Sequence, residues 1–135
     1  MKKKLLLLLL LGSAVFTACS KDDDNPEPEP VDLSGKNFAH LLFESQEACE
    51  EANETYFTNC AQTLEILDKE NAVLMLTDIL YNVNYEIEGD ILTVKAHEHT
   101  YEFDEDLIFQ IVDLQTLLLT SNQTEWKEFT DSIWE

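Results

Sequence analysis

The sequence predicts a mainly β domain in which about eight short antiparallel strands form an up-and-down meander that closes into a barrel. Three observations predict this fold. Residues 81–96 alternate apolar and polar side chains with a period of two, further short apolar segments recur along the chain, and the links between them are short and polar. Closure is favoured because it removes the exposed edges of a meander. The alternative is an open antiparallel sheet with one helix packed on a face, an α+β fold.

Residues 1–18 are interpreted as an export signal. Lys2, Lys3 and Lys4 precede the apolar run Leu5–Leu11, and the segment ends in the small residue Ala18. The 14 residues from Leu5 to Ala18 are fewer than the roughly 20 that a membrane-spanning helix needs. An ordinary secretory peptide or an N-terminal anchor helix are the alternatives.

The sequence Phe16-Thr17-Ala18-Cys19 resembles a bacterial lipobox. The resemblance implies cleavage before Cys19 and a membrane anchor of acyl chains on this residue, since one chain alone binds a membrane only marginally. The following residues, Ser20, Lys21, Asp22, Asp23 and Asp24, resemble the Cys-x-Lys-acidic export signal of Bacteroidota lipoproteins. That resemblance implies a lipoprotein of the outer membrane, exposed on the cell surface.

The expected mature chain has two parts. Residues 19–30 are acidic and contain alternating prolines, which favours a stiff, solvated and lipidated tether. Residues 31–135 then form a single domain of 105 residues, a length that suits one small core.

The most specific structural prediction is a hairpin over residues 81–96. Gly89-Asp90 is a Gly-first pair of the kind that favours a two-residue type II′ turn. With that turn, Ile87 faces Leu92, Tyr85 faces Val94 and Val83 faces Ala96, so the apolar side chains share one face. A register slip of one residue would destroy this match.

The remaining elements follow from shorter patterns. Ser45 is a predicted N-cap for a helix over Gln46–Phe57. Helical spacing of Trp126, Phe129 and Ile133 favours a short helix near the C-terminus, and a final strand through Trp126 is the alternative. Further strands are expected at Lys36–Phe43, Gln62–Leu67, Ala72–Thr77, Tyr101–Phe103, Ile108–Asp113 and Gln115–Thr120.

Cys49 and Cys60 are predicted to form a disulfide. Once Cys19 carries lipid, they are the remaining pair in an exported chain. Closing a loop of about a dozen residues stabilises a fold by roughly 3 kcal/mol in the chain-entropy model. Two free buried thiols are the alternative.

The domain as a whole resembles the small lipocalin-like domains of Bacteroidota lipoproteins. In those proteins a polar tether leads into Leu-x-Gly-x-Trp and then a meander, and here the corresponding residues are Leu33-Ser34-Gly35-Lys36-Asn37-Phe38, with Phe38 in the place of the tryptophan. The resemblance implies an eight-stranded lipocalin-like barrel whose inside holds side chains or one small ligand. Tyr81, Tyr85, Tyr101 and Phe103 are expected on the inner face.

Charge and motifs restrict the function. Removal of the signal leaves five lysines against 28 acidic residues, a formal charge of −23 with no arginine, so nucleic-acid binding is not expected. Since no catalytic motif is present, we expect neither an enzyme nor a cofactor. His97 and His99 are weak candidates for a peripheral metal site, and Ser132 in Asp131-Ser132-Ile133 resembles a Bacteroidota O-glycosylation site.

Two functional hypotheses remain. In the first, the domain is a non-catalytic binding module for a small apolar ligand or a glycan. In the second, it docks to another envelope or host protein and binds no small molecule. A large apolar cavity would favour the first hypothesis, and a filled core with an exposed aromatic patch would favour the second.

Overall fold

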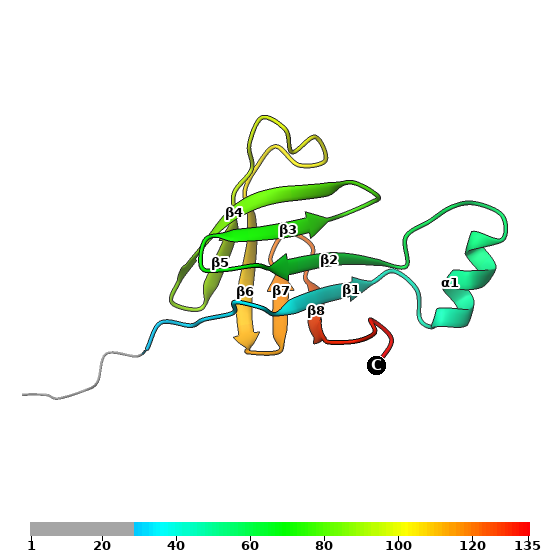
Figure 1. Ribbon diagram of the computed structural model, residues 1–135, viewed down its shortest axis with the longest axis horizontal. Coiled ribbons are helices and arrows are strands. Elements are labelled where there is room, and N and C mark those ends of the chain that lie inside the picture. The colour runs from blue at the N-terminus through cyan, green and yellow to red at the C-terminus, as the bar shows by residue number, and fades with distance from the viewer. Residues whose placement is uncertain (1–28) are drawn as a thin grey trace, which may run out of the picture.

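The computed structural model describes residues 29–135 and has the expected architecture, a closed antiparallel barrel with one short helix (Figure 1). Each strand pairs with the next along the chain, and the last strand pairs with the first. Residues 1–28, with the lipobox, Cys19, Lys21 and Asp22–Asp24, lie outside the described part. The elements are β1 (Asn37–Leu41), α1 (Gln46–Asn53), β2 (Ala61–Ile66), β3 (Asn71–Met75), β4 (Leu80–Glu88), β5 (Ile91–Val94), β6 (Leu107–Asp113), β7 (Thr116–Leu119) and β8 (Thr124–Phe129).

The register of the β4–β5 hairpin confirms two of the three predicted apolar pairs, and the third, Val83 with Ala96, lies beyond the end of β5 at Val94. Tyr85 pairs with Val94 and Ile87 with Leu92 across the two strands. Gly89 has a φ of 62°, a left-handed conformation that costs glycine little, so the two-residue link closes without strain. The alternating burial of β4, with Tyr81, Val83 and Tyr85 inside, follows from the period of two in its sequence.

Two element predictions are wrong. Residues 101–103 are not a strand but part of the turns linking β5 to β6, in which the Thr100 hydroxyl accepts the His97 N–H at 3.0 Å. Tyr101 consequently lies outside and is 79% exposed, not on the inner face. The segment around Trp126 is not the predicted helix but the strand β8, which was the alternative. Pairing with β1 and β7 on its two sides provides hydrogen-bond partners for its backbone.

Helix α1 ends at Asn53, four residues before the expected end. Ser45 caps its first turn as predicted, accepting the Ala48 N–H at 3.2 Å. The Asn53 side chain reaches back to the Cys49 carbonyl oxygen at 2.9 Å and accepts the Thr58 N–H at 2.9 Å. These bonds turn the chain out of the helix and back toward the barrel.

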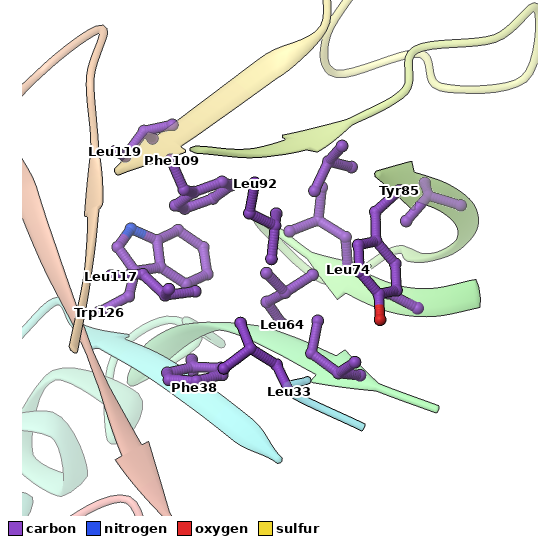
Figure 2. Packing of buried hydrophobic residues seen from close by; sticks show 14 of the residues in the cluster. Leu33, Phe38, Leu64, Leu74, Tyr85, Leu92, Phe109, Leu117, Leu119 and Trp126 are labelled. Carbon is purple, nitrogen blue, oxygen red and sulfur yellow. The ribbon is translucent and has the colours of Figure 1, made fainter. Parts of the chain in front are cut away.

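Side chains fill the interior of the barrel (Figure 2). Trp126 lies near its centre with the Phe109 ring packed edge-on against it, and the two ring centroids are 5.3 Å apart. Both rings are fully buried, as are Phe38 from β1 and Leu33 from the segment that precedes it. The other inward positions are Leu64, Ile66, Ala72, Leu74, Tyr81, Val83, Tyr85, Leu92, Val94, Ile111, Leu117 and Leu119.

The two ends of the barrel differ. At one end, which we call the tether end, residues 29–36 enter and the strand links are short: 67–70, 89–90 and 114–115. At the other, which we call the loop end, lie the links 42–60, 76–79, 95–106 and 120–123. Figure 1 shows the N-terminal segment leaving on the side opposite α1. The described N-terminal residues, 29–36, and the loop end thus lie on opposite sides of the barrel (Figure 1).

Candidate functional site

Apolar side chains occupy the interior of the barrel in the described part of the chain (Figure 2). Leu33 closes the tether end, where the Tyr85 hydroxyl also donates to the Asp68 carbonyl oxygen at 2.5 Å. At the loop end Phe103 from the link 95–106 packs edge-on against Tyr81, with ring centroids 5.8 Å apart. Two of the hollows of the described residues are lined without the core cluster, and the other three include core residues such as Tyr85, Val83 and Phe103 in their lining. Candidate sites therefore belong to the outer surface.

The loop end carries most of the large apolar side chains that are exposed on the described residues. The most exposed are Phe57 at 83%, Tyr101 at 79% and Tyr56 at 76%. They come from the two longest links, and further exposed apolar residues of the same end are Leu41, Leu42, Ile79 and Leu80. Leu42 and Phe57 line one hollow and Tyr101 lines another, so the exposed apolar groups of this end are divided between two links. Exposed apolar groups that lie together on a soluble protein often mark a binding site.

A hollow of about 320 Å³ lies among these residues, between the links 42–60 and 76–79. Its apolar lining comes from Leu42, Phe57 and Leu76, and its polar lining from Thr58, Asn59, Thr77 and Asp78. The Nδ2 atom of Asn59 is buried and has no hydrogen-bond acceptor in the part of the chain that the structure describes. Burying an amide donor without a partner costs free energy, so rotation of the Asn59 side chain toward the hollow, where a bound group accepts its hydrogen bond, would be favourable.

The link 42–60 is held by the cysteine pair. The Cα atoms of Cys49 and Cys60 are 5.6 Å apart, within the range of disulfides, which confirms that the two residues lie at disulfide distance. Cys49 is fully buried. Because a helix of eight residues is not stable alone, a bond between these two cysteines would restrain α1.

The link 95–106 is ordered by polar contacts at both of its ends. At its start Lys95 forms ion pairs with Glu86 and with Asp106, the latter at 3.3 Å. Asp106 also accepts the Ala96 N–H at 2.9 Å, and this bond, with Lys95 beside it, lowers the pKa of the Asp106 carboxyl. Burial and the nearby Glu102 carboxylate raise the pKa of the Tyr81 phenol beneath the link.

Glu102 ties the link 95–106 to its neighbour at the loop end. One carboxylate oxygen, Oε1, accepts a hydrogen bond from the Thr77 hydroxyl of the link 76–79. Among residues 29–135, neither the other oxygen, Oε2, nor the buried Tyr81 hydroxyl has a hydrogen-bond partner. We assign Glu102 to the structure of the loop end, because its bond from Thr77 joins the link 95–106 to the link 76–79.

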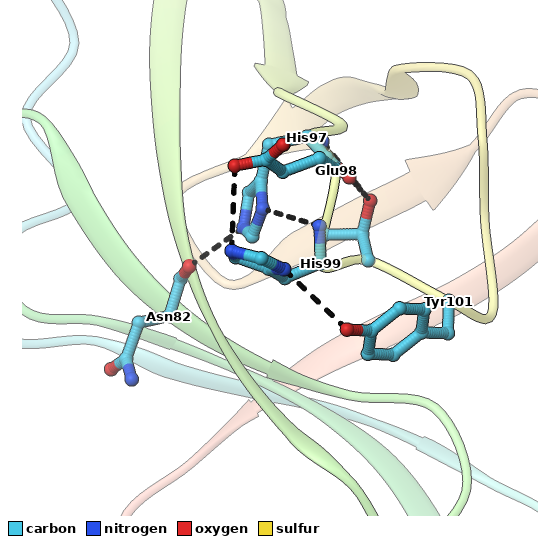
Figure 3. Close-up of polar contacts among 6 residues, drawn as sticks. Asn82, His97, Glu98, His99 and Tyr101 are labelled. Atoms are coloured by element: carbon cyan, nitrogen blue, oxygen red, sulfur yellow. Dashed lines mark hydrogen bonds and ion pairs between the residues drawn. The ribbon is translucent and has the colours of Figure 1, made fainter.

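The two candidate metal ligands, His97 and His99, make contacts within the chain (Figure 3). Both ring nitrogens of His97 are engaged by the backbone: Nε2 lies 3.1 Å from the Asn82 carbonyl oxygen, and Nδ1 lies 3.2 Å from the His99 N–H nitrogen. His99 lies toward solvent, with its Nε2 3.5 Å from Glu98. Among residues 29–135 no group of three or more potential metal ligands is present. His97 is thus a structural residue of the link 95–106.

A second hollow, of about 560 Å³, lies where the C-terminal residues fold back over the outer face of β1 and β8. Ile133 and Trp134 form one wall, and Leu41, Lys127 and Phe129 belong to the strands beneath. Its volume is in the range of small-molecule sites. The predicted glycosylation residue Ser132 lies beside it, and its hydroxyl accepts the Trp134 N–H at 3.1 Å.

Sequence reasoning missed the residues of the loop end. Tyr56 falls inside the predicted helix Gln46–Phe57, whereas it lies beyond the end of α1 and is exposed. The available signal was the pair Tyr56-Phe57 in the mostly polar stretch between Cys49 and Cys60.

Comparison with family models, with curated proteins and with solved structures found no match to this chain. Over residues 29–135 no helix has the length and apolar character to cross a membrane.

Proposed function

We propose that the chain is a lipoprotein of the outer membrane whose barrel is a rigid support for docking to another protein. In this proposal Cys19 carries the lipid, Lys21 and Asp22–Asp24 direct export to the cell surface, and the domain has no catalytic role. Under the oxidising conditions of export, Cys49 and Cys60 form a disulfide. The partner is an envelope or host protein.

One observation carries this proposal: the exposed aromatic side chains lie at the end of the barrel opposite the tether. The packed interior supports docking over ligand storage, since apolar side chains of the chain itself occupy the inside of the barrel. Tyr and Phe are enriched where proteins dock, because they bury a large area at low cost in conformational entropy. A tether that enters at the other end directs these residues away from the membrane.

Site-specific photo-crosslinking in intact native cells tests the proposal. A photoreactive phenylalanine analogue at Phe57 should give one discrete crosslinked species, and the same analogue at Leu114, 54% exposed at the tether end, should not. The Tyr56→Ala variant should weaken the Phe57 crosslink. A lack of crosslinks at Phe57, or equal crosslinks at both positions, would contradict docking by the loop end.

The hollow beneath the C-terminal residues supports a second candidate function, the binding of a small amphiphilic molecule or a glycan. Its walls combine Trp134 and Ile133 with the charged Lys127 and Glu125. Titration with N-acetylglucosamine or with anilinonaphthalene sulfonate should then change the fluorescence of Trp134, which is partly exposed, and not that of the buried Trp126. The Trp134→Phe variant is the control. An unchanged signal with both probes would exclude these two ligand types at this groove.

A further inference from the structure

We propose that the 320 Å³ hollow between the links 42–60 and 76–79 is the anchor point for a basic, extended segment of the partner protein, which places one large apolar side chain in it. This inference rests on the proposed docking function and adds the chemistry of the partner. Its three supports are the size and lining of the hollow, the buried Asn59 amide, and the charge of the surrounding links.

The size of the hollow suits a side chain better than a whole small molecule. Its volume is at the low end of the range of about 300–1,000 Å³ for small-molecule pockets. The apolar side chains Leu42, Phe57 and Leu76 line it, and the first two are 45% and 83% exposed in total. A side chain of leucine or tryptophan size in this place would bury both of them. Such a side chain in a closely fitting pocket is the usual centre of binding energy in a protein interface.

The Asn59 side chain indicates that peptide backbone accompanies the apolar group. Its Nδ2 donor lacks an acceptor, whereas the Nδ2 of nearby Asn53 donates to the Cys49 carbonyl oxygen at 2.9 Å. An extended segment lying across the hollow presents backbone carbonyl oxygens beside its side chain, and rotation of the Asn59 side chain into the hollow would let its amide donate to one of them. A purely hydrocarbon ligand would leave this donor unpaired and would bind less tightly for that reason.

The charge of the loop end requires a basic partner. The four links at this end contain eleven carboxylates and one lysine, Lys95, which already pairs with Glu86 and Asp106; the carboxylates are those of Glu44, Glu47, Glu50, Glu51, Glu54, Asp78, Glu98, Glu102, Asp104, Glu105 and Asp106. Positive charges flanking the apolar anchor would be attracted, and acidic segments would be repelled. The same field opposes contact with an anionic lipid surface.

Peptide binding to the lipidated mature protein in nanodiscs of neutral lipid tests the inference. Four fluorescein-labelled probes differ only in charge or anchor: GKKLKKG, GKKWKKG, the anchorless GKKGKKG and the acidic GEELEEG. We expect fluorescence anisotropy to show binding of the two basic anchored peptides and about tenfold weaker binding of the anchorless one. Raising NaCl from about 0.05 to about 0.5 M should weaken binding, because exposed charges are then screened.

Variants locate the binding site. Phe57→Ala and Asn59→Ala should each lower the affinity for GKKWKKG by about fivefold or more. Leu114→Ala at the tether end should leave this affinity unchanged. Phe57 is an exposed side chain, so its replacement leaves the barrel intact, which circular dichroism verifies. Equal binding of the anchored and anchorless peptides would overturn the inference, as would binding that ignores charge, or an absence of binding to all four probes.

The two tests separate the two proposals. A Phe57 crosslink in cells together with a negative peptide panel would retain docking by the loop end and refute the partner chemistry proposed here. Peptide binding in nanodiscs without a crosslink in cells would retain the anchor hollow and refute its use for docking in the native membrane.

Discussion

Replacement of Phe109 by alanine should destabilise the barrel strongly, whereas the same replacement at the neighbouring Ile108 should have little effect. Phe109 points into the core and is fully buried, and Ile108 points outward and is 43% exposed. Both belong to β6, between β5 and β7, so the two variants change the same backbone environment. Their comparison isolates the contribution of the packed interior.

The expected magnitude follows from what the Phe109 ring contacts. Removing a buried phenylalanine ring and leaving a cavity costs about 3–5 kcal/mol, and the edge-on contact with Trp126 accounts for about 0.5–1.5 kcal/mol beyond area burial. A domain of this size has a total free energy of unfolding of about 5–15 kcal/mol. Ile108→Ala removes a partly solvated side chain and should cost under about 1 kcal/mol.

Urea unfolding measures the difference. With an m value of about 2 kcal/mol/M, a loss of about 4 kcal/mol lowers the midpoint by about 2 M. Phe109→Leu keeps most of the side-chain volume and should lower the urea midpoint by less. This variant allows the measurement if the alanine variant does not fold. Equal midpoints for the Phe109 and Ile108 variants would mean that the ring lies in open space, and the assignment of a filled barrel would then be wrong.

Three further predictions concern the link 42–60, the charge at Asp106 and the tether. Reduction of the cysteine pair should remove hydrogen-exchange protection from α1 while the barrel amides stay protected, and unchanged protection of α1 would show that the pair does not restrain it. Asp106→Asn should lower stability at pH 7, because the folded state lowers the pKa of this carboxyl below its ordinary value of 3.8. That stabilisation is fully present above about pH 3.8 and is lost as the pH falls through the lower pKa of the folded state. The urea midpoints of the wild type and of Asp106→Asn should therefore converge in strong acid. A difference that stays constant with pH would contradict this prediction. Cys19→Ala should abolish the fractionation of the mature chain with membranes. Alanines at Lys21 and Asp22–Asp24 should leave the protein anchored but protected from protease added to intact cells. If this variant and the wild type were equally accessible to the protease, the acidic run would be only a spacer.

The strands that could be predicted are those whose pattern is local. The alternation from Tyr81 to Val94 defines its own register, and the structure reproduces it. Strand β8 was harder to predict, because the acidic Glu128 stands on the barrel side and interrupts the alternation of apolar residues. Its carboxylate forms an ion pair with Lys36 at 2.7 Å. The identity of β8 depends on pairing with β1, a contact between residues about 90 positions apart that no local pattern encodes.

The surface features were the least predictable. Tyr101 and Phe103 are two residues apart and look like one face of a strand, yet the turn at Thr100 sends one outward and the other into the barrel. Exposure of Phe57 likewise depends on where Asn53 ends the helix. Apolar residue type predicts burial on average, and only the three-dimensional course of a link decides which aromatic side chain stays outside.

The entry of the chain directly into β1 has a mechanical consequence. β1 is hydrogen-bonded on both sides, to β2 and to β8, and the preceding segment adds a bond from the Gly35 N–H to the Ile66 carbonyl oxygen at 2.8 Å. If a partner binds the loop end while the N-terminus is anchored in the membrane, a tensile force between the two acts along β1 and not across it. The bonds to both neighbours are then loaded together in shear instead of being opened one at a time. Under flow or cell movement, the docking contact should break before the barrel does.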